Sequence, residues 1–358
     1  MRNTVLVTYG VMAVAIALAG CAQEQADKED IPSLMSAANV SGLAIATIDD
    51  CQLDDIAYYG VDDVETGEAV DADTIFEGAS LTKTIFSVIV NQLADEGVID
   101  LDEPLAASFD YPRVTDKDAY AKLTPRIILE HRSGFPNWAS DPLDQETWGE
   151  IAFKYPPDTK FGYSGEAYQL LQAFVEAKTG QSLDDLFEQR LGDVMAKTSL
   201  SASGTAAFAF GHDKDGGKEK GRAVKPSPRA GAAYSVLTNA EDYARFLVHL
   251  CDGAGMSEDA RGDMLRPQSP TDDDDISWAL GWGVQLSGDA PIYFHWGDNE
   301  QFKAFAVFNT SSRDGVVFFA NAMNGLKLIE PLAEPVVGDV TPIADWLDYG
   351  RVGETAAE

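Results

Sequence analysis

The sequence predicts an α+β fold, with one antiparallel sheet built from both ends of the chain and a helical insertion between them. Three observations lead to this class. Strand-like apolar segments occur early, within residues 42–60, and return from residue 278 onward, whereas residues 121–270 are mainly helical segments and loops. Because strands from both chain ends can pair in one sheet, the middle of the chain is expected to be inserted into it.

The early strands are expected to form a hairpin. Residues 42–48 are typical of a strand, a turn-prone Asp-Asp-Cys-Gln segment follows, and residues 56–60 supply the second strand. The next element is a helix predicted over residues 80–96, where apolar side chains recur at helical spacing until Gly97 ends it.

The middle and the end of the chain are predicted from the same patterns. Phe174 lies in a helix that Gly180 ends, and the remaining helices are expected at residues 182–190, 242–250 and 329–337. A polar loop is expected at residues 213–222. The late strands are expected at residues 280–285, 292–295, 302–308 and 316–320, with a hairpin connection at residues 309–315.

These elements predict one large domain over residues 32–345. Its sheet is expected to come from residues 40–78 and 278–345, and its helical insertion from residues 80–275. Residues 346–358 are expected to be a tail.

The N-terminus resembles a bacterial lipoprotein signal. Arg2 and an apolar stretch precede Leu-Ala-Gly-Cys, which predicts that residues 1–20 are removed, that Cys21 carries lipid and that residues 21–31 form a tether. An uncleaved anchor helix is the alternative, although the stretch is short for a membrane span. Export to the periplasmic face of a bacterial membrane follows, and Ala22 after the cysteine favours the outer membrane.

Composition excludes several kinds of partner. The 358 residues include 26 Lys and Arg against 59 Asp and Glu, which gives a formal net charge of −33 at pH 7. So acidic a surface argues against binding nucleic acid or anionic lipid headgroups. The sequence has no Cys and His cluster at metal-ligand spacing and no glycine-rich phosphate loop, so neither a metal nor a cofactor is expected.

Cysteine is sparse. With Cys21 lipidated, only Cys51 and Cys251 remain. Export would permit a disulfide between them. Two buried free thiols are the favoured alternative, and the sequence leaves the pairing open.

Ser80 and Lys83 are the most informative pair of residues. They form a Ser-x-x-Lys motif at the start of the predicted helix 80–96, and residues three apart lie on one helix face, so the Lys83 amine can reach the Ser80 hydroxyl. A serine becomes an acyl-transfer nucleophile when a neighbouring base takes its proton. The helix N-terminus adds partial positive charge. A simple N-cap serine is the alternative.

Two further segments supply candidate groups. Tyr163 lies in a Gly- and Ser-rich loop, where a nearby ammonium would lower its phenol pKa and let the phenolate act as a base. A core tyrosine is the alternative. His295 could relay a proton or polarise the substrate, Gly297 would let a substrate approach the backbone, and the Asp298 N–H could bind an oxyanion. His131 is expected only to close a helix and fix a turn.

Together these segments resemble the class C β-lactamase and penicillin-binding-protein-like serine hydrolase family. The family's Ser-x-x-Lys, Tyr-Ser-x and His/Lys-x-Gly motifs correspond to residues 80–83, 163–165 and 295–297, and the resemblance covers about residues 35–325. It implies a β-lactamase/transpeptidase-like fold, which is an α/β sandwich plus a helical subdomain with the site between them.

The resemblance also implies a mechanism. Ser80 would attack a carbonyl carbon while Lys83 and Tyr163 exchange its proton. The N–H groups of Ser80 and Asp298 would hold the oxyanion. Water would then release the acyl-enzyme.

Two departures from the family pattern bear on the substrate. Gly165 stands where β-lactamases of this class carry an Asn that contacts the acylamide, and His295 replaces a Lys that would meet a carboxylate. Both favour neutral esters or amides. A D-Ala-D-Ala carboxypeptidase or true β-lactamase, and a non-catalytic cell-envelope binding protein, are the alternatives. The sequence does not identify the substrate, which is expected to be a small molecule, a peptide or an ester. It also leaves the oligomeric state open.

Overall fold

A computed structural model describes residues 31–141, 148–201 and 207–353 of the chain. Its main element is an eight-stranded sheet in the order β2-β1-β13-β12-β11-β10-β9-β8, in which every pair of neighbours is antiparallel. Its strands are β1 (Gly42–Asp49), β2 (Gln52–Gly60), β8 (Ser269–Pro270), β9 (Ile276–Trp278), β10 (Gly283–Gln285), β11 (Ile292–Asn299), β12 (Phe302–Asn309) and β13 (Gly315–Ala320).

The two ends of the chain meet in this sheet, as predicted. β1 pairs with β13 from Leu43 opposite Ala320 to Ile48 opposite Gly315. The predicted β1–β2 hairpin is also present, and its two turn residues, Asp50 and Cys51, both have positive φ angles, of 42° and 60°. Two positive φ angles match the twist of the flanking strands.

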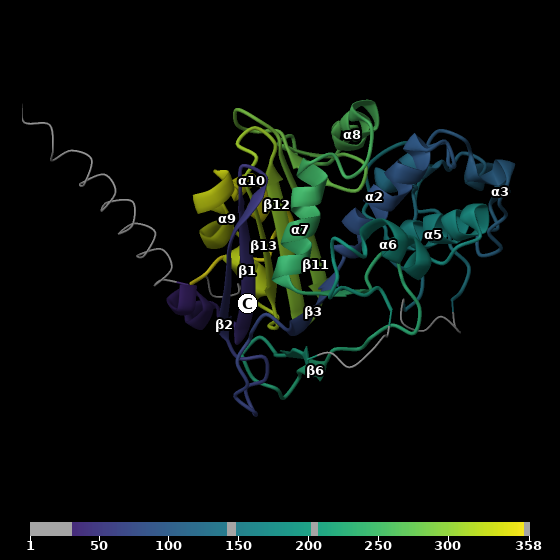
Figure 1. Cartoon of the computed structure of the whole chain (residues 1–358). Coiled ribbons are helices and arrows are strands. Elements are labelled where there is room, and N and C mark those ends of the chain that lie inside the picture. The colour runs from purple at the N-terminus through teal and green to yellow at the C-terminus, as the bar shows by residue number, and fades with distance from the viewer. Residues whose placement is uncertain (1–30, 142–147, 202–206, 354–358) are drawn as a thin grey trace, which may run out of the picture.

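Both faces of the sheet are covered, which gives three layers (Figure 1). Because successive side chains of a strand point to opposite faces, Ala44 and Ala46 of β1 join the cluster that includes α7 (Ala240–Cys251), whereas Leu43 and Ile45 join the cluster that includes α9 (Ile329–Val337). The α9 layer also includes the helical residues 31–38 and α10 (Thr341–Leu347). The predicted sandwich is therefore confirmed.

The remaining helices lie mainly to one side of the sandwich (Figure 1). At their centre is α2 (Thr82–Asp95), which is buried on all sides from Thr82 to Leu93, as expected of an internal helix. Around it and along the rest of the chain are η1 (Leu105–Ala107), α3 (Lys117–Tyr120), α4 (Pro125–Leu129), α5 (Gly165–Thr179), α6 (Leu183–Leu191), α8 (Glu258–Leu265) and η2 (Gly325–Leu328).

The stretch expected to be a helical insertion, residues 80–275, differs from that expectation in two ways. Its helix α7 packs on the main sheet. It also contributes short strands, of which β4 (Ala207–Phe208) and β7 (Val236–Thr238) flank β3 (Thr74–Ala79), and β5 (Phe210–Gly211) pairs with β6 (Arg222–Ala223). Strands this short carry little periodic signal, and only the packed chain determines which surface α7 covers.

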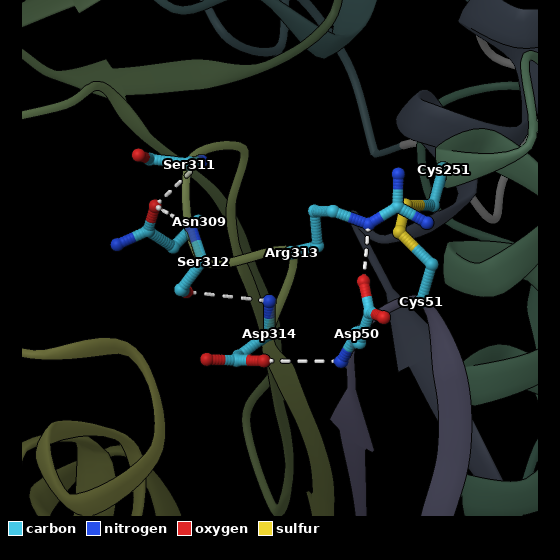
Figure 2. Close-up of a disulfide and its surroundings, with 8 residues drawn as sticks. All are labelled: Asp50, Cys51, Cys251, Asn309, Ser311, Ser312, Arg313 and Asp314. Carbon is cyan, nitrogen blue, oxygen red and sulfur yellow. Dashed lines mark hydrogen bonds and ion pairs between the residues drawn. A yellow bond between two sulfur atoms is a disulfide. The ribbon is translucent and has the colours of Figure 1, made fainter.

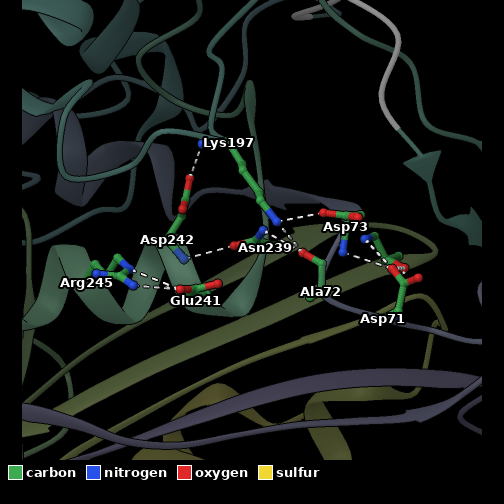
Figure 3. Close-up of polar contacts among 9 residues, drawn as sticks. Asp71, Ala72, Asp73, Lys197, Asn239, Glu241, Asp242 and Arg245 are labelled. Atoms are coloured by element: carbon green, nitrogen blue, oxygen red, sulfur yellow. Dashed lines mark hydrogen bonds and ion pairs between the residues drawn. The ribbon is translucent and has the colours of Figure 1, made fainter.

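A polar network fastens the start of α7 to the segments around it (Figure 3). Asn239 caps the helix by accepting a hydrogen bond from the Asp242 N–H at 2.9 Å, and its amide donates to the Ala72 carbonyl at 3.2 Å. The Lys197 N–H donates to the Asp242 carboxylate, while its ammonium pairs with Asp73 at 2.7 Å. The network thus joins α7 to the loop before β3 and to residue 197.

A disulfide joins Cys51 to Cys251, with Cα atoms 5.9 Å apart (Figure 2). The favoured alternative, two buried free thiols, is therefore wrong. Cys51 lies in the β1–β2 turn and Cys251 ends α7, so the packing of α7 on the sheet brings together residues 200 positions apart. The Asp50–Arg313 ion pair, at 2.6 Å, links the same turn to the β12–β13 connection.

Breaking this disulfide is expected to lower thermal stability without abolishing activity. Closing so long a loop restricts the unfolded chain, and losing a native disulfide typically costs about 2–5 kcal/mol. The measurement is a thermal melt of the wild type with and without reductant, beside the Cys51→Ser/Cys251→Ser protein. Equal melting temperatures for all samples, or two free thiols in the untreated wild type, would contradict the assignment.

No helix within residues 31–141, 148–201 and 207–353 has the length and apolar character of a membrane span. The predicted signal at residues 1–20 and the lipidation site Cys21 lie outside the described residues.

Candidate active site

Ser80 lies at the junction between β3 and α2. The residue before it, Ala79, has a φ of 49°, a strained conformation for a residue other than glycine. The Thr82 hydroxyl holds this junction, because it donates to the Ala79 carbonyl at 2.6 Å and accepts from the Val236 N–H at 2.9 Å. Such strain is typical of functional sites, and here it delivers a half-buried serine at the start of a helix.

Lys83 is fully buried and points back to Ser80. Its ammonium nitrogen lies 3.0 Å from the Ser80 Oγ and 2.8 Å from the Ala233 carbonyl oxygen, and within the described part of the chain it forms no ion pair. Burial without a carboxylate disfavours the charged form, so the pKa of Lys83 is lowered well below its ordinary value. The side chain can therefore hold an uncharged amine that accepts the serine proton.

Tyr163 is half-buried, and its ring centre lies 4.8 Å from the Lys83 Nζ. Burial raises the pKa of its phenol far above the ordinary range, and the nearby Ser80 hydroxyl offsets only part of that rise. The sequence predicted a lowered pKa from a neighbouring ammonium. The structure differs because burial dominates and also discharges Lys83, so Tyr163 is suited to donate and relay a proton, and Lys83 is the better base.

His131 has the structural role predicted for it. With a φ of 55°, it follows α4, and its carbonyl accepts the Gly162 N–H at 2.8 Å. Its Nδ1 accepts the Ser164 N–H at 3.1 Å, and its ring packs against Tyr163 in a tilted arrangement with ring centres 4.2 Å apart. His131 therefore orients the loop that carries Tyr163.

His295 is buried beside the same group of residues. Its Nδ1 bonds to the Trp296 carbonyl at 2.9 Å, and burial, together with Lys83, lowers its pKa to about 3. The ring is therefore neutral at ordinary pH. A neutral imidazole offers little attraction to a substrate carboxylate.

Two glycines of the motifs serve the fold in ways that the sequence did not indicate. A side chain at Gly297 would clash with the carbonyl of Gly78, so this glycine lets β11 approach β3, which corrects the expectation that it accommodates a substrate. A side chain at Gly165 would clash with the indole of Trp138. An aromatic ring therefore covers the position where family β-lactamases carry the side chain of Asn.

Ser80, Tyr163 and Asp298 all line one cavity of about 680 Å³. Its lining does not include Lys83, His295, Gly297 or Gly165. Sequence reasoning missed several lining residues, namely Glu77, Asn137, Trp138, Arg222, Trp296 and Tyr349. Only Glu77, a buried acid within an apolar strand, left a signal in the sequence.

Glu77 anchors one side of this cavity. Its carboxylate pairs with Arg222, with Nη2 2.7 Å from Oε2, and accepts hydrogen bonds from the Asn299 amide at 2.8 Å and the Lys225 N–H at 3.0 Å. A buried carboxylate with this many donors is compensated, so Glu77 fixes the end of β11 and leaves substrate contact to its neighbours. No cluster suited to a metal ion occurs among the described residues.

Known proteins that are similar to this chain include relatives of β-lactamases and penicillin-binding proteins. The family model described as Beta-lactamase matches residues 28–333. Penicillin-binding protein 4 of Amycolatopsis lactamdurans is 28% identical over 91% of this chain and 97% of its own length. Among solved structures, D-alanine carboxypeptidase AmpC from Burkholderia cenocepacia has a TM-score of 0.69 at 20% identity, covering 86% of this chain and 97% of that one. The octameric penicillin-binding protein homologue from Pyrococcus abyssi has a TM-score of 0.70 at 19% identity, covering 84% and 74%.

Proposed function

Because this chain belongs to the beta-lactamase family, we propose that its cavity hydrolyses a neutral ester or amide, with Ser80 as the nucleophile. Membership makes the chain a serine hydrolase that acts through an acyl-enzyme. The observation that carries the proposal is the 3.0 Å contact between the Ser80 hydroxyl and a buried Lys83 whose pKa is lowered.

The proposed acylation begins when the Ser80 oxygen attacks the carbonyl carbon and its proton moves to the Lys83 amine. Tyr163 then donates its phenol proton to the leaving group and regains one from Lys83. In deacylation, a water molecule gives a proton to the same pair and attacks the ester carbonyl. The bond from the acyl carbon to the Ser80 oxygen then breaks, the pair returns the proton to that oxygen, and the acid product leaves.

The oxyanion is proposed to bind the N–H groups of Ser80 and Asp298. Asn299 and Phe302 pair across a two-residue turn and so close the β11–β12 ladder as a hydrogen-bonded pair. Alternation along the ladder then directs the Asp298 N–H away from β12. The neighbour of β11 on the side opposite β12 is β10, which pairs only with residues 292–294 of β11. The Asp298 N–H is therefore open for a substrate.

Charge in the cavity supports a neutral substrate. The cavity wall includes four acidic and two basic side chains, namely Glu77, Asp141, Asp298, Glu300, Arg222 and Lys225. Glu77 and Asp298 are paired with Arg222 and the buried Lys303, and the neutral His295 stands where relatives carry a lysine. A substrate carboxylate therefore lacks the cation that relatives offer at position 295. The alternative, a D-alanine carboxypeptidase or β-lactamase, is favoured by the exposed ammonium of Lys225, which lines the same cavity.

The test compares three substrates on the purified protein: a short-chain nitrophenyl ester, a chromogenic cephalosporin and a peptide ending in D-Ala-D-Ala. Our proposal expects kcat/KM for the ester to exceed the others by at least about tenfold, a difference of about 1.4 kcal/mol in transition-state binding. Preference for the cephalosporin or the peptide would replace it with the alternative. Failure of all three, together with no covalent labelling of Ser80, would favour a binding protein.

We also propose that the protein is a lipoprotein of the bacterial cell envelope. The signal-like N-terminus ending at Cys21 supports this location, and the family match to a penicillin-binding protein is consistent with it. Fatty-acid labelling in the producing cell should be lost in the Cys21→Ser protein. Persistent labelling would overturn the assignment.

A further inference from the structure

The C-terminal segment, expected to be a tail, reaches the active-site cavity. Asp348 has a left-handed φ of 55° and ends α10, which turns the chain so that Tyr349 lines the cavity. The Tyr349 hydroxyl donates to the Asp298 Oδ2 at 2.8 Å. Tyr349 is therefore bonded to the side chain of the residue whose N–H is proposed to bind the oxyanion.

The second carboxylate oxygen of Asp298 joins two other segments. Oδ1 accepts the Glu300 N–H at 2.9 Å and pairs with the buried ammonium of Lys303. That ammonium also lies 5.4 Å from the centre of the Tyr349 ring. The carboxylate thus links the β11–β12 turn, β12 and the C-terminal segment, and Tyr349 covers the ion pair.

The C-terminal segment is itself firmly anchored. The Trp346 ring packs against Trp296 with ring centres 5.7 Å apart and against Trp278 at 6.3 Å. On the other side of Tyr349, Arg351 pairs with Glu330 at 2.5 Å. Burial and the Asp298 carboxylate raise the pKa of Tyr349, so its phenol remains a donor.

We propose that Tyr349 is a positioning residue of the active site: its hydroxyl holds the Asp298 carboxylate and thereby fixes the backbone N–H of Asp298 toward the oxyanion. This inference rests on the proposed function. Removing an oxyanion donor typically costs about 10²–10³ in rate, and loosening one costs less. Because the oxyanion forms only in the transition state, the loss falls on kcat and leaves KM nearly unchanged.

The test is Tyr349→Phe, alone and combined with Asp298→Ser, measured as ester kcat and KM and as the rate of fluorophosphonate labelling of Ser80. A serine at 298 can still accept the Glu300 N–H but is too short for Tyr349. We expect Tyr349→Phe to lower kcat and the labelling rate about tenfold, with KM changed less than about twofold. In the Asp298→Ser background the same change should have little further effect, because the two residues act as one unit.

The matched control is Tyr293→Phe, which removes a similar hydroxyl donor, 2.7 Å from the Leu265 carbonyl, that does not line the cavity. It should lower the melting temperature without changing kcat.

An unchanged kcat in Tyr349→Phe, or a tenfold loss that is fully additive with Asp298→Ser, would overturn the inference. If Asp298→Ser fails to fold, the kinetics of Tyr349→Phe decide the question by themselves: the loss must fall on kcat and leave KM nearly unchanged. Wild-type labelling that Tyr349→Phe leaves unchanged overturns this inference only, whereas no wild-type labelling overturns the proposed function as well.

Discussion

Replacing Ser80 by alanine is expected to abolish acylation, with kcat falling by about 10⁴-fold or more. The nucleophile supplies the bond that forms in the first step, and removing such a residue from a comparable hydrolase leaves only what binding and the oxyanion donors contribute. The measurement is intact-protein mass after fluorophosphonate treatment, with ester turnover beside it. The wild type should gain one probe mass and Ser80→Ala none.

The matched control for Ser80 lies on α2, the helix that follows it. Ser87 donates its hydroxyl to the Leu280 carbonyl at 2.6 Å and is fully buried, away from the cavity. Ser87→Ala should lose about 1 kcal/mol of stability and keep wild-type labelling. Labelling that persists in Ser80→Ala would show that the nucleophile lies elsewhere.

Replacing Lys83 by methionine is expected to lower kcat/KM by about 10²–10⁴-fold, the usual contribution of a general base. In the wild type, kcat/KM should rise with pH as the Lys83 amine loses its proton, and it should level off below the ordinary lysine pKa because burial lowers the pKa. Lys83→Arg keeps a cation that cannot accept a proton and should be equally inactive. Tyr163→Phe retains the base and should lose less activity.

The Lys83→Met substitution is also expected to raise the stability of the fold. Between the lowered pKa of Lys83 and the ordinary value of about 10.4, the unfolded chain binds one proton more than the folded chain, so wild-type stability rises with pH in this window. Lys83→Met removes that penalty. Its melting temperature should exceed that of the wild type at neutral pH, and the difference should shrink as the pH rises. Wild-type activity in Lys83→Met, or a lower melting temperature, would contradict the role of a buried neutral base.

Much of the sheet could be predicted from periodicity. The strands β1, β12 and β13 are mainly apolar segments between turn residues, and α9 matches the predicted helix at residues 329–337. Elements with weak local patterns were not predicted, such as β4 and β8, which have two residues each. The segment at residues 346–353 was misjudged because single residues fasten it: Trp346 packs against Trp296, and Tyr349 lines the cavity.

Local spacing along the chain was enough to predict the order of the main strands and helices, the Ser-x-x-Lys pair and the family. Tertiary structure alone decided the protonation of the site, since the pKa values of Lys83 and His295 follow from burial among residues distant in sequence. It also decided the Cys51–Cys251 disulfide and the contact of Tyr349 with Asp298. Both join segments that only the packed chain brings together, and no periodicity in the sequence records such a contact.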